Sequence, residues 1–283
     1  MRDRIFKTLL VLSSILIFFM CGAIFYSLFT DSISAFSHFG IVEFITGKHW
    51  DPNPDREAYG ALPFIMGTLL TSFLALLFCI PFALAVALFN GEYFRGKKIA
   101  TVLSTVVDLL AGIPSVIYGL WGFYTLRPII VSLGLSEQGF GILTASIVLA
   151  IMIIPYAASL STQFITLVSN DLKEGVYSLG GTRLDVVRRV IFPNAGAAMT
   201  ASFVLALGRA LGETMAVTML IGNTNNMPDS ITGTANSMAS IIANQFGEAS
   251  DLRLSSLVAI GLLLFLITAV INFLGKMIVK RFN

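Results

Sequence analysis

Charged residues are scarce in this sequence of 283 residues. Only 12% of the residues are Asp, Glu, Lys or Arg, whereas 56% are hydrophobic, and the mean hydropathy is +0.85. A soluble domain carries about a quarter charged residues, so this chain has too little polar surface to cover a water-soluble globule. The net charge of +2 also lacks the basic excess of nucleic-acid-binding proteins, and we expect no nucleic-acid partner. Such an apolar surface is stable in contact with lipid, so the composition predicts a membrane protein.

Cysteine and histidine are also rare. Cys21 and Cys79 both lie inside apolar runs, which argues against a disulfide framework or a metal site. His38 and His49 are expected in one polar loop that faces water, too isolated to form a metal cluster. The sequence lacks the pattern G-x-x-x-x-G-K-[ST] of P-loop nucleotide-binding proteins. We therefore expect no catalytic residue, no metal and no cofactor, and any ATP hydrolysis must occur in a separate subunit.

Long apolar runs, by contrast, are abundant. A helix needs about 20 apolar residues to cross a bilayer, and helices are forced because each backbone amide in lipid must be paired. Six segments meet this requirement: 9–29, 62–89, 99–126, 142–168, 194–221 and 254–279. The first is too long for a signal peptide and no convincing cleavage site follows it, so we expect it to remain. The predicted fold is an all-α membrane protein with six transmembrane helices.

The basic residues are distributed unevenly between the two sides. If the N-terminus is cytoplasmic, 13 of the 18 Lys and Arg residues lie inside, four lie outside and Arg209 lies within the membrane. An excess of Lys and Arg marks the cytoplasmic side. We therefore predict a multi-pass protein of the bacterial inner membrane with both termini in the cytoplasm. The external loops 30–61 and 222–253 are too short and too polar to form independent domains.

The cytoplasmic segment between the fourth and fifth spans contains two short helical stretches that meet at Gly180 and Gly181. A glycine pair supplies the positive φ of a sharp turn. We expect a short amphipathic element that presents Glu174 and Tyr177 outward and docks in a groove on a partner. The alternative interpretation is an interfacial helix that arginines anchor to lipid headgroups.

This segment resembles the EAA loop of ABC importer permeases. Glu174-Gly-Val, Gly180 and the later Ile-Phe-Pro193 follow the family pattern, which runs E-A-A, then a glycine, then I-x-L-P. The sequence departs from the pattern where Gly, Val and Phe replace Ala, Ala and Leu. In the family the loop forms the coupling helix that sits in a cleft of the ATPase subunit. The resemblance implies that residues 170–193 couple to an ATPase through four positions: Glu174, Tyr177, Gly180 and Gly181.

The fifth predicted span contains Arg209 and Glu213 near its middle. A charge at that depth is costly and survives only beside a partner or a water-filled path. At a spacing of four the two side chains would share one helix face, beside small residues that admit a neighbouring helix: Ser202, Ala206 and Ala210. A guanidinium matches an oxyanion such as phosphate, and the carboxylate could accept a hydrogen bond from protonated phosphate. We predict that both line a solute path; a structural ion pair is the alternative.

The third predicted span contains Asp108, for which we expect a structural role with backbone or hydroxyl donors as partners. Gly112 and Pro114 follow it and should loosen or kink that helix.

Three further stretches, 59–68, 111–122 and 208–217, resemble in the right order motifs of phosphate permeases of the PstC type. The likeness runs from about Tyr59 to the C-terminus, and the form Gly-Glu-Thr-Met-Ala favours the PstC type over its sister PstA type. It implies a permease subunit of an ATP-driven phosphate importer with a type I ABC importer permease-like bundle. Residues 62–283 would form this unit, and 1–61 an N-terminal helix and external loop. In the family, the residues that match Arg209 and Glu213 are implicated in phosphate passage.

The resemblance also implies partners: a homologous PstA-like permease that completes the phosphate path, two copies of a PstB-like ATPase, an external PstS-like phosphate-binding protein, and membrane lipids. One alternative keeps this architecture with sulfate, molybdate or another anion as cargo. A membrane-embedded enzyme is disfavoured because no predicted span contains a histidine. A secondary transporter is disfavoured because an ion-driven carrier needs no ATPase dock.

Overall fold

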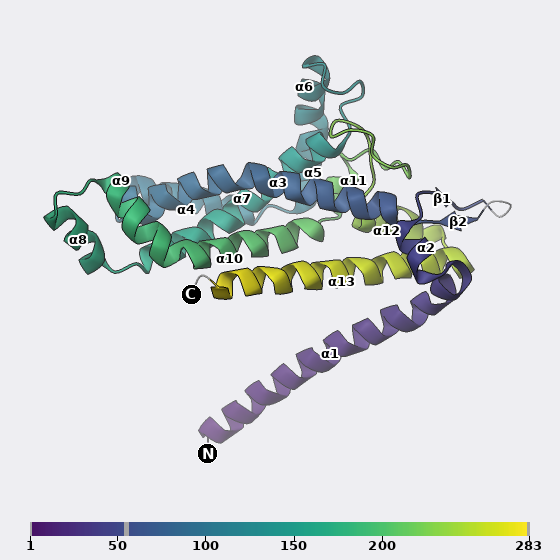
Figure 1. Cartoon of the computed structure of the whole chain (residues 1–283), viewed down its shortest axis with the longest axis horizontal. Coiled ribbons are helices and arrows are strands. Elements are labelled where there is room, and N and C mark those ends of the chain that lie inside the picture. The colour runs from purple at the N-terminus through teal and green to yellow at the C-terminus, as the bar shows by residue number, and fades with distance from the viewer. Residues whose placement is uncertain (1, 54–56, 282–283) are drawn as a thin grey trace.

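Five helical segments of the described chain are long and apolar enough to cross a membrane. The computed structural model describes residues 2–53 and 57–281. The spanning segments comprise Phe6–Phe39, Leu62–Tyr93, Ile142–Thr166, Arg183–Leu211 and Asp251–Lys280. Helices α3, α7, α10 and α13 run along one common direction, whereas α1 slants away from them toward its start (Figure 1). A sixth candidate span is a bent pair of helices, Lys98–Ala111 and Ser115–Ser132. The six predicted apolar runs therefore all lie on helices, but two of them are interrupted.

Residues 2–53 and 57–281 form the following elements. The helices are α1 (Arg2–Phe39), α2 (Ile41–Thr46), α3 (Leu62–Leu88), α4 (Lys98–Ala111), α5 (Ser115–Trp121), α6 (Arg127–Ser132), α7 (Ile142–Thr166), α8 (Asn170–Ser178), α9 (Arg183–Val186), α10 (Phe192–Leu211), α11 (Met215–Thr218), α12 (Met238–Gln245) and α13 (Asp251–Arg281). Three π turns, η1 (Phe89–Tyr93), η2 (Gly122–Leu126) and η3 (Val187–Ile191), and one 3₁₀ turn, η4 (Phe246–Glu248), join them. The strands β1 (Trp50–Asp51) and β2 (Ala58–Tyr59) form an antiparallel hairpin.

The third predicted span, 99–126, is not one helix. The chain bends by 94° between α4 and α5, so that α5 and α6 stand away from the bundle axis (Figure 1). The break falls at Gly112–Pro114, because proline has no N–H to donate and disfavours a helical residue before it. The hydroxyl of Tyr118 donates to the carbonyl oxygen of Leu110 at 2.8 Å and so pairs a carbonyl beside the break. The expected kink is therefore a complete break.

The fifth predicted span, 194–221, has different ends in the structure. The helix begins at Arg183, continues through η3 and α10, and ends at Leu211. The π turn η3 ends at Ile191, two residues before Pro193, which lacks the backbone donor of an ordinary α-helix. The first helix is also longer than predicted, because α1 extends to Phe39 and includes His38, which we had expected in a loop.

Helix α7 is the centre of the bundle and packs against α3, α10 and α4. The hydroxyls of Ser161 and Ser202 share a hydrogen bond of 2.7 Å between α7 and α10. The predicted stripe of small residues on α10 is buried, with Ser202 and Ala206 fully inaccessible and Ala210 2% exposed. The expectation that this face of α10 packs inside the bundle is thus confirmed.

The segments expected to be polar external loops form a packed cap on one end of the bundle. Trp50 of the hairpin lies edge-on to Tyr59 and Phe64, with ring centroids 4.8 and 5.2 Å away. Its indole N–H donates to Oε1 of Gln245 at 3.1 Å and ties the hairpin to α12. Burial is the main cause that raises the pKa of Tyr59. The aromatic residues of these segments therefore form a core with α3, α12 and α13.

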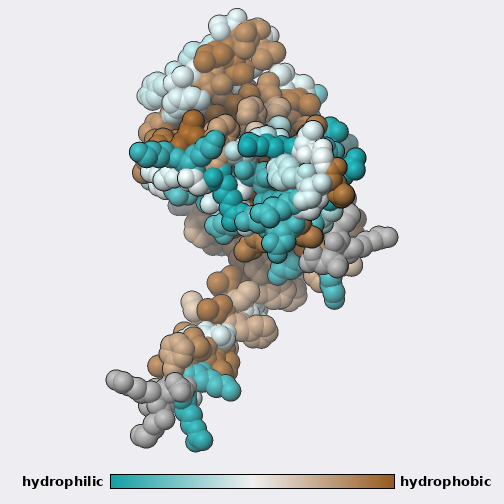
Figure 2. Space-filling model, turned by 90° about the vertical axis from the view of Figure 1, so that its left-hand side faces the viewer, coloured by the Kyte–Doolittle hydropathy of each residue, from teal (hydrophilic) through white to brown (hydrophobic). Residues whose placement is uncertain are grey.

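The two ends of the bundle differ in what they carry. Helices α8 and α9 lie at one end, which the start of α1 and the end of α13 also approach, whereas α2, α12 and the hairpin lie at the other (Figure 1). Figure 2 looks onto the first end, where hydrophilic side chains gather between hydrophobic flanks. The start of α1 and the end of α13 thus lie on the side of the predicted coupling loop.

The contact between α3 and the segment before α12 leaves no space for a side chain at Gly67. A Cβ atom there would overlap the backbone carbonyl oxygen of Asn236. We expect Gly67→Ala to lower the thermal unfolding midpoint of the purified protein, because overpacking costs about 1–3 kcal/mol. The control is Gly22→Ala on α1, where a Cβ would meet nothing within 4 Å. Equal midpoints for the two variants would contradict this packing.

Candidate coupling segment and solute-path residues

The predicted coupling segment is a helical hairpin that two glycines close. Helix α8 begins after Ser169, whose Oγ accepts a hydrogen bond from the N–H of Asp171 at 3.2 Å. Gly180 has φ +81°, and the N–H of Gly181 donates to the carbonyl of Val176 at 2.9 Å. A Cβ on Gly181 would overlap the Val176 side chain. The turn therefore needs glycine at both positions. Gly180 adopts a positive φ that other residues disfavour, and Gly181 leaves room for the Val176 side chain.

A capping box fixes the second arm of the hairpin. The backbone N–H of Thr182 donates to Oδ2 of Asp185 at 2.9 Å, and the N–H of Asp185 donates to Oγ1 of Thr182 at 3.3 Å. The Thr182 hydroxyl also donates to Oδ2 at 2.7 Å. Both oxygen acceptors of this box are therefore used by groups of the first turn. The start of α9 is thus defined by local side chains.

The outer surface of the hairpin is open and partly apolar. Glu174 and Gly180 are exposed, Tyr177 is 42% exposed and Leu179 is 91% exposed. Gly181 is half-buried against Val176. The predicted outward positions of Glu174 and Tyr177 agree with this geometry. An exposed leucine and tyrosine next to a carboxylate form a surface that a protein groove can cover.

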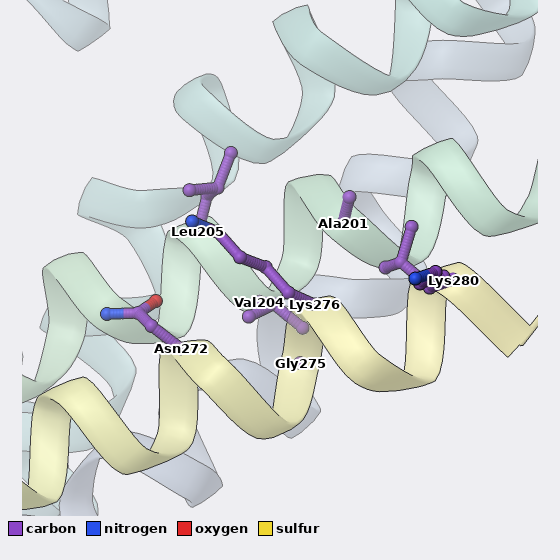
Figure 3. A pocket seen from close by; sticks show the side chains of 8 residues that line it. Ala201, Val204, Leu205, Asn272, Gly275, Lys276 and Lys280 are labelled. Atoms are coloured by element: carbon purple, nitrogen blue, oxygen red, sulfur yellow. The ribbon is translucent and has the colours of Figure 1, made fainter.

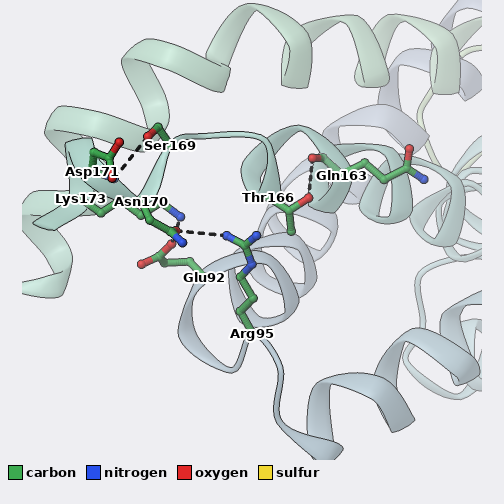
Figure 4. Close-up of polar contacts among 8 residues, drawn as sticks. All are labelled: Glu92, Arg95, Gln163, Thr166, Ser169, Asn170, Asp171 and Lys173. Carbon is green, nitrogen blue, oxygen red and sulfur yellow. Dashed lines mark hydrogen bonds and ion pairs between the residues drawn. The ribbon is translucent and has the colours of Figure 1, made fainter.

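The inner side of the hairpin contains a buried ion pair that sequence analysis missed. Nζ of Lys173 on α8 lies 2.6 Å from Oε2 of Glu92 on η1, and the two side chains are only 7% and 11% exposed. Figure 4 shows Lys173 and Glu92 between α8 and the end of the second span, with Arg95 donating to Oδ1 of Asn170 at 3.4 Å nearby. The partners lie 81 residues apart, so no local pattern signals them. This pair attaches the hairpin to the spanning helices.

An apolar cluster supports the ion pair from the second arm. Val186, Val187, Val190 and Ile191 pack with Ile165 of α7, and each is at least nine-tenths buried. Two of the arginines of this arm have protein partners. Arg189 lies 3.5 Å from Asp185, and the guanidinium carbon of Arg183 lies 6.0 Å from the Tyr93 ring centroid. These contacts weaken the alternative of a helix anchored to lipid headgroups.

Arg209 and Glu213, predicted on one helix face, lie on two sides of a helix end. Arg209 is in the last turn of α10, and Gly212 caps that helix. Glu213 follows the cap, and its Oε1 accepts a hydrogen bond from the N–H of Ala216 at the start of α11, at 3.2 Å. The predicted shared face is therefore wrong, because Gly212 ends the helix between the two residues.

The surroundings of the two charges are partly open. Arg209 is exposed and its guanidinium carbon lies 5.9 Å from the ring centroid of Tyr156, while Glu213 is half-buried. Among the described side chains the ion pairs are Lys173–Glu92 and Arg189–Asp185, so Arg209 and Glu213 do not neutralise each other. The alternative of a sealed structural ion pair thus finds no support. The arrangement offers an oxyanion one accessible guanidinium and one carboxylate acceptor.

A groove between α10 and α13 lies apart from these charges. It has a volume of about 280 Å³, and Figure 3 shows its walls of small and apolar side chains with Asn272, Lys276 and Lys280 on α13. Neither Arg209 nor Glu213 lines it. It is therefore not the predicted solute path.

Comparison with known proteins gives three findings. The model of the family of binding-protein-dependent transport system inner membrane components matches residues 80–283. The phosphate transport system permease protein PstC of Haemophilus influenzae is 38% identical over 99% of this chain and 93% of its own length. The protein of the same name from Pasteurella multocida is 39% identical over 95% of this chain and 88% of its own length.

Solved structures share the fold at low sequence identity. A bacterial alginate ABC transporter chain superposes with a TM-score of 0.68 over 99% of this chain and 96% of its own length, at 18% identity. A chain of the methionine transporter MetNI gives a TM-score of 0.63 over 78% of this chain and 94% of its own length, at 19% identity. These likenesses confirm the predicted all-α fold of a type I ABC importer permease.

The buried Lys173–Glu92 pair makes a sharp prediction for stability. Removing one partner of a buried pair leaves an unpaired charge and costs about 3–5 kcal/mol, whereas replacing both by apolar residues is often close to neutral. We expect Glu92→Leu and Lys173→Leu each to lower the thermal unfolding midpoint strongly, and the double variant to recover most of the loss.

The control for this cycle is Arg189→Ala. The Arg189 side chain is 77% exposed, and pairs of this kind contribute little, so we expect almost no change. Additive losses in the double variant would contradict a direct interaction between Glu92 and Lys173.

Proposed function

The chain belongs to the family of binding-protein-dependent transport system inner membrane components, and from this premise we propose that it is the membrane-spanning permease subunit of an ATP-driven phosphate importer. One observation carries the proposal: relatives named phosphate transport system permease protein PstC match nearly the whole chain at 38–39% identity. Their names favour phosphate over sulfate or molybdate as cargo. The fold of the bundle agrees with an importer permease.

The energy for transport would come from a separate ATPase that docks on α8. The open surface around Glu174, Tyr177 and Gly180 supports this assignment, since it lies at the tip of a hairpin that is fixed on its inner side. Closure of two ATPase copies would push the hairpin, and the buried Lys173–Glu92 pair would carry the displacement into the second span. The side that holds α8 and the ends of α1 and α13 would be the cytoplasm.

A second, homologous permease would complete the path, and we assign the transporting unit to residues 62–283. Helices α5 and α6 stand away from the bundle and expose large apolar side chains, among them Ile117, Leu120 and Ile129. Their position suits contact with another membrane subunit. An external phosphate-binding protein would dock on the opposite end, where α2, the β1–β2 hairpin and α12 form the cap.

Arg209 and Glu213 would meet the phosphate on its way. The guanidinium of Arg209 would donate hydrogen bonds to phosphate oxygens. Glu213 would accept a hydrogen bond from the proton that hydrogen phosphate retains, and it would repel an anion without such a proton. The interruption between α10 and α11 supports this role, since discontinuous helices flank solute sites in many transporters.

Docking of the ATPase on α8 can be tested by crosslinking. A cysteine in place of Ser178 would lie on the exposed surface of the hairpin, while the natural Cys21 and Cys79 lie on spanning helices. We expect Ser178→Cys to crosslink to the ATPase in the assembled complex, and Ser132→Cys on α6 to give no such product. An assembled complex with no Ser178→Cys crosslink would refute the docking site.

The solute path can be tested by uptake of labelled phosphate into cells. We expect Arg209→Ala and Glu213→Ala each to reduce uptake by about tenfold or more, the loss expected for a charged hydrogen bond worth about 1.5–3 kcal/mol. The amount of assembled protein should stay the same. Asp229→Ala in the exposed loop serves as a control. Wild-type uptake in both path variants, or equal competition by sulfate, would argue against the assignment.

A further inference from the structure

A second polar site lies between the end of the second span, α4 and α7. It is a cavity of about 160 Å³, and six polar residues line it together with Val86 and Val107: Asn90, Ser104, Asp108, Ser159, Thr162 and Gln163. None of these residues belongs to the coupling surface or to the Arg209–Glu213 region. A cavity of this size holds an ion together with a few water molecules. Six polar side chains at one place in a lipid-spanning chain need a physical reason.

Asn90 shows that the cavity presents an unsatisfied acceptor. The residue is only 8% exposed and its Nδ2 donates to Oγ of Ser104 at 3.2 Å, yet its Oδ1 has no hydrogen-bond partner. A buried carbonyl oxygen without a partner is destabilising, because it has lost its hydrogen bonds to water. The hydroxyl of Thr162 donates to the carbonyl of Ala158 at 2.7 Å, which leaves its oxygen lone pairs free to accept. The cavity is therefore rich in acceptors.

Asp108 adds a formal negative charge without a matching positive one. The described chain provides its carboxylate with no hydrogen bond or ion pair, although we had expected backbone or hydroxyl donors, and no Lys, Arg or His lines the cavity. Lys98, at the start of the same helix, is exposed. Asp108 is exposed in the single chain, so its carboxylate is accessible to a counter-ion from outside the chain.

The backbone holds Asn90 against the cavity wall. Asn90 is the second residue of the π turn η1, and a π turn often marks a functional site in a helix. A Cβ on the next residue, Gly91, would lie 2.8 Å from Cγ2 of Ile165, so η1 packs directly on α7. The asparagine is therefore placed by tight packing and has little freedom to turn away.

We propose that this cavity binds one hard monovalent cation of the Na⁺ type, with the Asp108 carboxylate and Oδ1 of Asn90 as principal ligands. The hydroxyl and amide oxygens of Ser104, Thr162 and Gln163 complete an all-oxygen set, which suits a hard cation. One carboxylate neutralises one positive charge, which favours a monovalent ion over a divalent one. A transition metal is disfavoured, because the described residues contain no group of three His, Cys, Asp or Glu side chains.

Binding of radioactive sodium to the assembled transporter, purified in mild detergent, tests the site directly. Choline replaces sodium to keep the ionic strength constant, and no phosphate or ATP is added, so the result does not depend on what the chain transports. We expect saturable binding to the wild type and an affinity at least about tenfold lower in Asp108→Asn, since each factor of ten is ~1.4 kcal/mol. Asp229→Asn, in the exposed loop, should bind like the wild type.

A second variant keeps the test decisive if Asp108→Asn fails to assemble. Asn90→Asp adds a carboxylate beside Ser104, whose hydroxyl can donate to it, and we expect tighter sodium binding than in the wild type. Absence of saturable binding to the wild type would overturn the proposal. Unchanged affinity in Asp108→Asn, or no gain in Asn90→Asp, would do the same.

Discussion

Every backbone N–H and C=O of this chain that lies in lipid must find a partner within the protein. This constraint explains the long helices α1, α3, α7 and α13, and it also explains what happens where a helix stops. At the break after α4, the Tyr118 hydroxyl pairs with the Leu110 carbonyl. At the break after α10, the Glu213 carboxylate pairs with the Ala216 N–H. At both breaks a side chain therefore adds a hydrogen bond to a backbone group beside the interruption.

The same constraint explains why the predicted path residues lie at an interruption. A guanidinium and a carboxylate at membrane depth need water, a partner or a ligand. A helix end needs the same, because its last carbonyls and the first N–H groups of the next helix have no helical partners. The two charged side chains and the unpaired backbone groups of the helix end both lie at residues 209–213. One open region can therefore supply hydrogen-bond partners to all of them. Arg209 remains exposed and Glu213 is half-buried in the single chain, which leaves both available to a neighbouring subunit or a solute.

The parts of the fold that local sequence determines were predictable, and those that depend on distant contacts were not. Apolar length located α3, α7 and α13 within a few residues, and the Gly180–Gly181 turn followed from backbone conformation. Hydropathy is averaged over a window and does not register a single helix-breaking residue such as Pro114 or Gly212. The predicted spans 99–126 and 194–221 therefore each combined helices that are separate in the structure. The Lys173–Glu92 pair joins residues 81 positions apart, and the cavity around Asp108 draws on three helices. No periodicity in one segment contains that information.

The position of the π turns connects these features. The turn η1 carries Glu92, which pairs with Lys173 on α8, and Asn90, which lines the acidic cavity two residues away. The turn η3 follows α9, the other arm of the same hairpin. A π turn departs from the regular hydrogen-bond ladder of an α-helix and is frequent at functional sites. The hairpin contacts η1 through α8 and continues into η3 through α9, so under the proposed function a displacement of α8 would reach the second and fifth spans at these two turns. In such a movement the buried Lys173–Glu92 pair would be the direct link between α8 and η1.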